Sequence, residues 1–138
     1  MNILMTGARG FMGKNLRAAL IGRYGDAHRL TLLDMPHTEE ELLAAAAEAD
    51  FVFHLAGVNR PTDPADFQKG NGDFTRQLLT LLKERGKRPP VLLSSSIQAA
   101  LENPYGQSKL SAEQAVADYG RETGAAVYLY RLPNVFGK

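Results

Sequence analysis

Short apolar runs alternate with amphipathic stretches along most of the chain. The runs have the length and the aliphatic or aromatic content of buried strands, and they cover residues 3–5, 30–33, 51–55, 91–93 and 126–130. The stretches between them carry apolar residues at helical spacing and predict helices over residues 11–21, 38–49, 71–85 and 105–122. Thr38 and Glu41 form the pattern of a capping box, which marks the start of the second helix.

This alternation predicts an α/β fold in which a parallel sheet is covered by helices on both faces. Because crossovers between parallel strands are right-handed, the simplest arrangement is five strands in the order 2-1-3-4-5. The chain has the length of one domain, spanning residues 1–138. In such a sheet ligands bind at the carboxyl ends of the strands where the order reverses, here between the strands at Ile3 and Phe51.

The composition narrows the classes of partner. There are 16 basic and 15 acidic residues without any basic tract, which argues against nucleic acid or an anionic membrane as the main partner. The chain has no cysteine, so disulfides and thiolate metal sites are excluded, and we expect no metal site. Its apolar runs are too short to span a bilayer, and residues 2–5 have the pattern of a strand rather than of a signal peptide. We therefore expect a cytoplasmic protein.

Three glycines, Gly7, Gly10 and Gly13, join the first predicted strand to the first predicted helix. A tight turn with bare backbone amides at a helix start can hold a pyrophosphate, and a Cβ atom would obstruct both the turn and the ligand. The spacing differs from the G-x-G-x-x-G of many dehydrogenases, and an ordinary glycine-rich turn would have the same residues. The strand before it and the helix after it favour nucleotide binding. The residues expected to line the cofactor here are Gly7, Arg9, Gly10, Phe11, Met12 and Gly13.

Two charged residues give opposite indications of which dinucleotide binds. Asp34 ends the second strand about 20 residues beyond the glycines, where a carboxylate holds the ribose hydroxyls of NAD and repels the 2′-phosphate of NADP. Arg9 could instead pair with that 2′-phosphate and favour NADP. Each also has a simpler interpretation, Asp34 as a turn residue before Pro36 and Arg9 as a solvated side chain. The sequence leaves NAD and NADP open.

A Tyr-x-x-x-Lys pair, Tyr105 and Lys109, opens the fourth predicted helix. Residues four apart on a helix share a face, and an ammonium beside a phenol favours the phenolate form. Tyr105 could then act as general acid or base on a substrate oxygen. A hydroxyl at the end of the fourth strand would hold the same oxygen, with Ser96 the first choice and Ser95 the second. Such pairs are common on helices, and serines after a strand are typical of turns, so the prediction depends on both groups lying at one edge of the sheet.

With these residues in place, the chain resembles the extended short-chain dehydrogenase/reductase family, in its NAD-dependent epimerase/dehydratase group. The matching segments follow the family's order, at residues 6–13, 53–57, 71, 94–96, 105–109 and 131–137. The resemblance implies a Rossmann-like, doubly wound parallel sheet and an NAD(P)-dependent oxidoreductase. Further segments are similar to those of reductases in bacterial capsule and O-antigen sugar synthesis, at residues 54–61, 93–99 and 103–110. That branch implies reduction of the C4 keto group of a UDP-linked 2-acetamido-2,6-dideoxyhexose, with hydride from NADPH.

The resemblance also implies roles for individual residues. Tyr105 would protonate the C4 oxygen, Lys109 would support Tyr105 and bind the nicotinamide ribose, and Ser96 would hydrogen-bond the C4 oxygen. The remaining cofactor-binding residues would be Leu55, Ala56, Gly57, Asn71, Ser94 and Arg131. The substrate-binding residues would be Asn59, Arg60, Ser96 and Asn134. His54 is expected to lie in the core or behind the site rather than to act as a catalyst.

The chain departs from the family pattern in two places. Asp34 leads almost directly into the helix at Thr38, so it matches either the family's ribose carboxylate or its adenine-contacting aspartate. The sequence stops at Lys138, whereas much of the family's sugar pocket and, in the capsule-sugar branch, a cupin domain follow that position. We therefore expect a truncated, cofactor-binding part that need not be active alone.

Two other functions are compatible with the same residues. One is a nucleotide-sugar epimerase or dehydratase, which regenerates its cofactor. The other is a non-catalytic dinucleotide-binding module that regulates a partner, although such a module needs neither Tyr105 nor Lys109. Many relatives pair through their two long helices, here those near Asn71 and Tyr105, which implies a homodimer.

Overall fold

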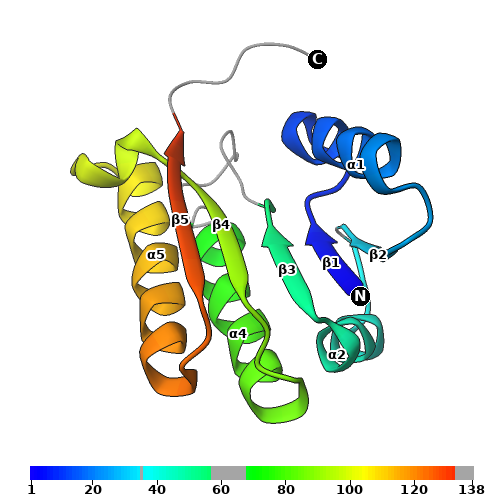
Figure 1. Ribbon diagram of the computed structural model, residues 1–138. Helices are drawn as coiled ribbons and strands as arrows, with labels where there is room; N and C mark the ends of the chain where they lie inside the picture. Colours follow the sequence, from blue (N-terminus) through cyan, green and yellow to red (C-terminus); the bar gives the residue numbers. More distant parts are fainter. Residues whose placement is uncertain (35, 57–67, 133–138) are drawn as a thin grey trace.

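A parallel five-stranded sheet forms the centre of the computed structural model, which describes residues 1–34, 36–56 and 68–132 (Figure 1). The strands are β1 (Asn2–Thr6), β2 (Arg29–Leu33), β3 (Phe51–His54), β4 (Val91–Ser96) and β5 (Val127–Leu132). Their order in the sheet is β2-β1-β3-β4-β5, and every neighbouring pair is parallel. The strand order expected from the sequence is therefore confirmed.

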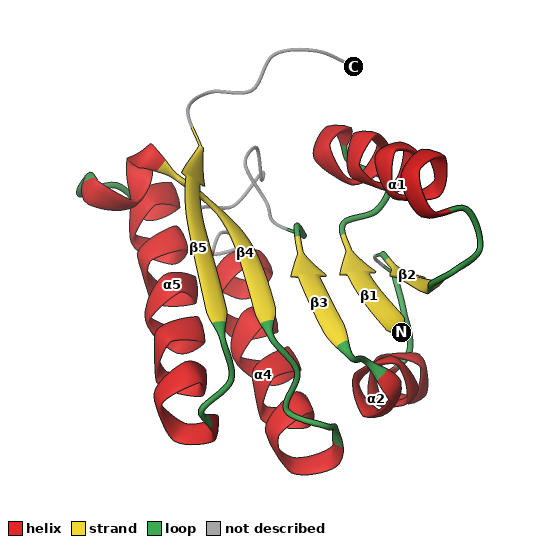
Figure 2. Ribbon diagram, viewed as in Figure 1, coloured by secondary structure: helices red, strands yellow, loops and turns green. Residues whose placement is uncertain are grey.

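Helices connect these strands on both faces of the sheet (Figure 2). The α-helices of the described residues are α1 (Phe11–Tyr24), α2 (Glu39–Glu48), α4 (Phe74–Arg85) and α5 (Pro104–Thr123). A π-helical turn, η1 (Gln68–Asp73), precedes α4, and a 3₁₀ turn, η2 (Ile97–Ala100), follows β4. Helix α1 lies on one face and α2, α4 and α5 lie on the other, as right-handed crossovers require when the chain reverses its direction across the sheet. None of the helices that the structure describes is both long and apolar enough to cross a membrane.

The ends of two helices follow the signals in the sequence. Thr38 Oγ1 accepts a hydrogen bond from the Glu41 backbone amide at 3.0 Å, and the Thr38 amide donates to Glu41 Oε1 at 3.2 Å, which completes the capping box of α2. Asn103 Oδ1 accepts from the Gly106 amide at 2.7 Å and caps α5, with Pro104 at the first helical position. The cap fixes where the first turn of α5 begins.

The main core lies between the sheet and the three helices on one face. The residues that meet there are almost completely buried, among them Leu4, Leu42, Val52, Leu78 and Val116. Burial of each such side chain contributes about 1.5–3 kcal/mol. Tyr119 of α5 closes this core, and its hydroxyl donates to the Pro89 carbonyl at 2.7 Å.

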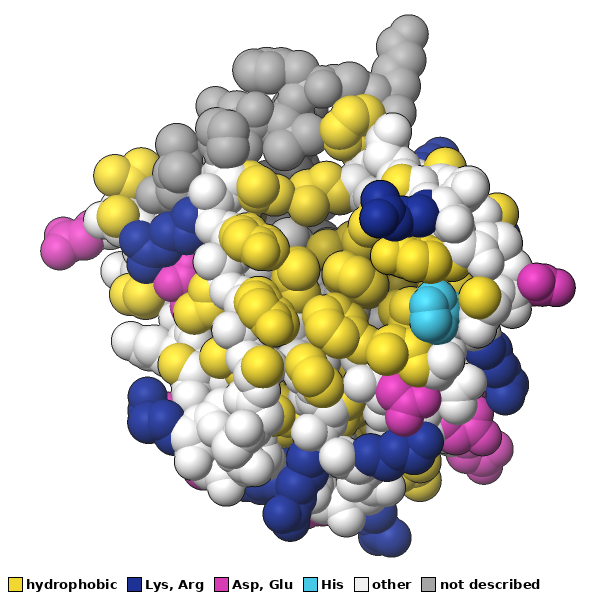
Figure 3. Space-filling view, in the orientation of Figure 1, with side chains coloured by type: hydrophobic (Ala, Val, Ile, Leu, Met, Phe, Trp, Pro, Cys, Tyr) yellow, Lys and Arg dark blue, Asp and Glu magenta, His cyan; other side chains and the backbone are white. Residues whose placement is uncertain are grey.

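The opposite face of the sheet is apolar but, among the described elements, only α1 covers part of it. Phe51 and Phe53 of β3 are half-buried there, and Tyr128 of β5 is 42% exposed. The rings of Phe51 and Tyr128 stack with their centroids 6.3 Å apart, and the Phe51 and Phe53 centroids are 4.9 Å apart. Figure 3 shows a broad apolar area over the strands on this face.

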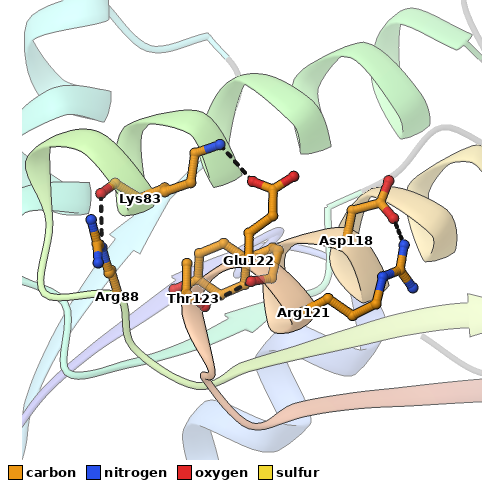
Figure 4. Close-up of polar contacts among 7 residues, drawn as sticks. Lys83, Arg88, Asp118, Arg121, Glu122 and Thr123 are labelled. Carbon is orange, nitrogen blue, oxygen red and sulfur yellow. Dashed lines mark hydrogen bonds and ion pairs between the residues drawn. The ribbon is translucent and has the colours of Figure 1, made fainter.

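One polar contact links α4 to α5, and a second joins α4 to the segment that follows it (Figure 4). Lys83 Nζ donates to Glu122 Oε2 at 2.7 Å, and Arg88 Nε donates to the Lys83 carbonyl at 3.3 Å. The Lys83–Glu122 pair is exposed to solvent, which screens the charges, so it contributes little to stability. Apolar packing therefore accounts for most of the contact between the two helices.

Two boundaries differ from the sequence expectation. Strand β4 does not end before the serines but continues through Ser96, because residues 94–96 pair in register with residues 130–132 of β5. The helix expected from Asn71 begins with the π-helical turn of η1 and becomes an α-helix only at Phe74. The first difference arises from pairing with β5, which lies far along the sequence.

The same substitution at two positions of α1 tests the packing of its first turn. A Cβ atom at Gly13 would lie 2.2 Å from the Gly7 carbonyl oxygen, whereas one at Gly22 would have no atom within 4 Å. We expect Gly13→Ala to lower the free energy of unfolding by about 1–3 kcal/mol. We expect Gly22→Ala to raise it by about 0.5–1 kcal/mol, because alanine is the better helix former. Equilibrium urea unfolding of both variants measures these changes, and equal effects would contradict the packing described.

Candidate active site

The glycine turn between β1 and α1 lies against the end of β3. The Gly7 backbone has φ 70°, a left-handed conformation that favours glycine, and its amide donates to the Leu33 carbonyl at 3.1 Å. A Cβ atom at Gly7 would lie 2.7 Å from the Ala56 amide nitrogen, too close for any side chain. The carboxyl ends of β1, β2 and β3 therefore meet at one edge, where the strand order reverses.

The turn fits a dinucleotide phosphate. Gly7 and Gly13 are required by packing within the chain, but a Cβ atom at Gly10 would meet only the Gly7 carbonyl, at 3.4 Å. A side chain at Gly10 would thus be tolerated by the fold, while it would fill the space beside the start of α1. Gly10 is the N-cap residue of α1 and gives no side-chain hydrogen bond to the first helical amides. Backbone amides at a helix start bind phosphate well.

Arg9 and Asp34, which give opposite indications about the cofactor, contact each other. The Arg9 amide donates to Asp34 Oδ1 at 3.2 Å, and Arg9 Nε lies 3.7 Å from Asp34 Oδ2. The Arg9 side chain is 70% exposed and that of Asp34 only 18% exposed. The two residues thus form one unit at the end of β2, with the carboxylate inside and the guanidinium outside.

Thr6 is a residue of this edge that sequence reasoning missed. Its hydroxyl oxygen accepts hydrogen bonds from the Leu55 and Ala56 amides, each at 3.1 Å. It thereby holds two residues expected to approach the cofactor through their backbone. In the sequence, the only indication of this role was that a threonine directly precedes the glycine turn.

Tyr105 and Lys109 lie in the first turns of α5, on one face as their spacing predicts. Lys109 Nζ is 5.8 Å from the centroid of the Tyr105 ring. The lysine is only 7% exposed, and this burial lowers its pKa to about 8, against the opposing effect of the Glu113 carboxylate. At neutral pH Lys109 therefore retains its proton and places a positive charge beside the phenol.

Glu113 is a second site residue that sequence reasoning missed. It lies one turn after Lys109, and its two carboxylate oxygens accept from Arg131 Nε and Nη2, each at 2.8 Å. Burial raises the pKa of Glu113, but the hydrogen bonds and charge of Arg131, together with the Lys109 charge, more than offset this, so the pKa lies below its usual value. Arg131, predicted to bind the cofactor, is thus joined to α5 by an ion pair. The four-residue spacing of Tyr105, Lys109 and Glu113 was the signal in the sequence.

The three serines are buried and form the end of β4. Because side chains alternate along a strand, Ser94 and Ser96 point to one face of the sheet and Ser95 to the other, with Leu93 of the main core. Ser95 therefore faces the helices, whereas Ser96 lies on the side of α1. The choice of Ser96 over Ser95 as the catalytic hydroxyl stays a prediction.

Asn71, in η1, is buried against α5. Its Nδ2 donates to Ser108 Oγ at 2.9 Å, one residue before Lys109. The predicted residues Gly57, Asn59, Arg60 and Asn134 lie outside the residues that the structure describes. Among those described, no three metal-binding side chains gather in one place.

Comparisons with known proteins agree with this arrangement. A family model described as the NAD dependent epimerase/dehydratase family matches residues 3–138. The UDP-2-acetamido-2,6-beta-L-arabino-hexul-4-ose reductase of Pseudomonas aeruginosa is 44% identical over an alignment that covers 100% of this chain and 37% of the reductase.

Solved structures give the same result. The capsular polysaccharide assembling protein CapF of Staphylococcus aureus is 49% identical with a TM-score of 0.83, and the match covers 100% of this chain and 37% of CapF. The RMD protein of Pseudomonas aeruginosa, solved with NADPH, is 32% identical with a TM-score of 0.74, over 97% of this chain and 55% of RMD. The chain thus spans little more than a third of the reductase and of CapF. It belongs to the NAD-dependent epimerase/dehydratase family.

Proposed function

We propose that this chain is the cofactor-binding and catalytic part of an NAD(P)H-dependent reductase. Its substrate would be the C4 keto group of a UDP-linked 2-acetamido-2,6-dideoxyhexose, in the cytoplasmic synthesis of capsule or O-antigen sugars. The observation that carries the proposal is the Tyr105–Lys109 pair, with Lys109 buried and charged beside the phenol. The 44% identity to a hexulose reductase supports the choice of substrate.

In this proposal the reduced nicotinamide cofactor, when bound, supplies a hydride to C4. The Tyr105 hydroxyl gives its proton to the C4 oxygen, which gains negative charge as the carbonyl is reduced. The Lys109 ammonium stabilises the phenolate that Tyr105 becomes. Ser96 donates a hydrogen bond to the same C4 oxygen and keeps it within reach of Tyr105.

In this proposal the glycine turn holds the cofactor phosphates, and the Arg9–Asp34 pair contacts the adenosine ribose of the cofactor. Asp34 faces inward, where a carboxylate accepts hydrogen bonds from ribose hydroxyls, and the exposed Arg9 guanidinium can reach a 2′-phosphate. This arrangement accommodates NADH and NADPH, with NADPH gaining from Arg9. We also propose that two copies pair through α4 and α5, as the family resemblance implies.

Tyr105→Phe tests the catalytic assignment. Removing the hydroxyl deletes the proton donor, so we expect kcat to fall by about 10²–10⁴-fold in the full-length protein. Cofactor affinity should stay within about twofold, since the helix and Lys109 are retained. Tyr24→Phe, at the far end of α1, is the matched control and should keep full activity. Turnover is measured as the rate at which NADPH is oxidised while the hexulose is reduced.

Other outcomes of this assay contradict the proposal. A fully active Tyr105→Phe protein would remove Tyr105 from the mechanism. An epimerase or dehydratase would convert a nucleotide sugar without net oxidation of NADPH. A non-catalytic module would bind the cofactor and turn over no sugar.

Arg9→Ala tests the cofactor preference. Loss of a charge-assisted contact to the 2′-phosphate should raise the Kd for NADPH by about tenfold and leave that for NADH within about twofold. Arg17→Ala removes the same charge from an exposed position of α1 and should change neither value by more than about twofold. Calorimetric titration measures all four affinities. Equal weakening of both cofactors by Arg9→Ala would count against a 2′-phosphate contact.

Glu113→Gln tests the charge environment of Lys109. The Glu113 carboxylate raises the pKa of Lys109 against the effect of burial, so removing the carboxylate lowers that pKa below about 8. Lys109 then loses its proton at lower pH, and the alkaline limb of kcat/KM should move to lower pH by about half to one unit. Glu122→Gln, on the exposed side of the same helix, should leave the profile unchanged. An alkaline limb that stays in place in Glu113→Gln would disprove the coupling.

A further inference from the structure

His54 lies at the centre of a chain of buried hydrogen bonds that the proposed reaction does not use directly. The side chain is 1% exposed, at the end of β3. Its Nδ1 is 2.7 Å from Thr6 Oγ1 of β1, and its Nε2 is 2.8 Å from Thr75 Oγ1 of α4. One imidazole therefore connects the strand before the glycine turn to a helix on one face of the sheet.

From Thr75 the chain of hydrogen bonds continues to the catalytic helix. Thr75 Oγ1 donates to the Asn71 carbonyl at 2.5 Å, and Asn71 Nδ2 donates to Ser108 Oγ at 2.9 Å. Ser108 Oγ then donates to the Tyr105 carbonyl at 2.7 Å. The last acceptor belongs to the backbone of the residue that carries the catalytic phenol.

The direction of each hydrogen bond can be assigned, because a carbonyl oxygen only accepts. The single hydroxyl proton of Thr75 goes to the Asn71 carbonyl, so Thr75 must accept from His54, and Nε2 carries a proton. Thr6 Oγ1 already accepts from the Leu55 and Ala56 amides, so its own proton goes to His54 Nδ1. All donors consequently point the same way, from β1 toward α5.

The imidazole is neutral in this arrangement. A proton on Nδ1 would face the Thr6 hydroxyl, whose oxygen already accepts two amide protons. Burial, together with the nearby Lys109 charge, lowers the pKa of His54 to about 3. A neutral histidine with its proton on Nε2 satisfies every partner.

We propose that His54, through this chain of hydrogen bonds, is a positioning residue that holds the first turn of α5, and with it Tyr105, in register with the glycine turn. The inference rests on the proposed function for its catalytic consequence. The two ends of the chain are Thr6, directly before Gly7, and Tyr105, at the start of α5. A proton donor and a cofactor must be aligned within a fraction of an ångström, and small displacements cost large factors in rate. Aligned hydrogen bonds in a buried site also strengthen one another.

Thr75→Val, compared with Thr75→Ser, tests the inference without changing His54 or Tyr105. Valine has the shape of threonine but breaks two links, whereas serine keeps the hydroxyl. We expect hydrogen exchange of the Gly106 amide, in the first turn of α5, to accelerate about tenfold in Thr75→Val. The reference is the Val52 amide, which donates to the Pro90 carbonyl at 3.0 Å in the core and reports global opening. Thr75→Ser and the exposed Thr80→Val should leave this ratio unchanged within about twofold.

Ser108→Ala supplies a second variant at the other end of the chain, should Thr75→Val not fold. It removes the last link, so exchange at Gly106 should again accelerate about tenfold relative to Val52. In this variant nitrogen NMR of the imidazole should still show the proton on Nε2. A proton found on Nδ1 of wild-type His54, or equal acceleration of the Gly106 and Val52 amides in both variants, would overturn the inference.

Turnover separates this inference from the proposed function. In the full-length protein, Thr75→Val should lower kcat about tenfold with the cofactor Kd within about twofold, and Thr75→Ser should restore it. A wild-type protein that reduces no sugar would reject the reductase proposal, while the exchange ratios still decide whether the chain positions α5. An active wild type with unchanged kcat in Thr75→Val would reject the positioning role alone.

Discussion

The approach of the Gly7 turn to the backbone of Leu55 and Ala56 is the constraint on which the site depends. The contact is between two main chains, so no change of side-chain rotamer could relieve a Cβ atom placed 2.7 Å from the Ala56 nitrogen. The close approach brings the ends of β1 and β3 together and lets Thr6 accept from the two amides that follow β3. Gly13 repeats the constraint against the Gly7 carbonyl. Packing within the chain therefore requires two of the three glycines, whereas it would tolerate a side chain at Gly10.

The strand order, and features set by the spacing of residues a few positions apart, could be predicted from the sequence. The strand order follows from the alternation of apolar runs with helical periods and from the handedness of crossovers. The capping box at Thr38 and the shared face of Tyr105 and Lys109 depend on spacings of three and four residues, which the helix fixes by itself. The glycine turn was predictable for the same reason.

The particular residues that contact one another across long stretches of sequence could not be predicted. The serine run continues β4 because β5, more than 30 residues later, supplies its hydrogen-bonding partners. Glu113 gains its ionic partner from Arg131, 18 residues away, and His54 bonds Thr6 across 48 residues. Arg9 and Asp34 favour different cofactors when taken separately in the sequence, 25 residues apart, whereas in the structure they form a single pair.

The uniform direction of the hydrogen bonds through His54 has a consequence for how these positions can change over evolution. His54 and Thr75 each accept a hydrogen bond from the preceding group and donate one to the next. Replacing either side chain by one that reverses its donor and acceptor would leave two buried neighbours without partners. The direction of these hydrogen bonds can reverse within the same fold only when the adjoining residues are replaced as well. Thr6, His54 and Thr75 should therefore vary among related proteins as one correlated set, and Asn71 with Ser108 as a second, because Thr75 bonds only the backbone carbonyl of Asn71.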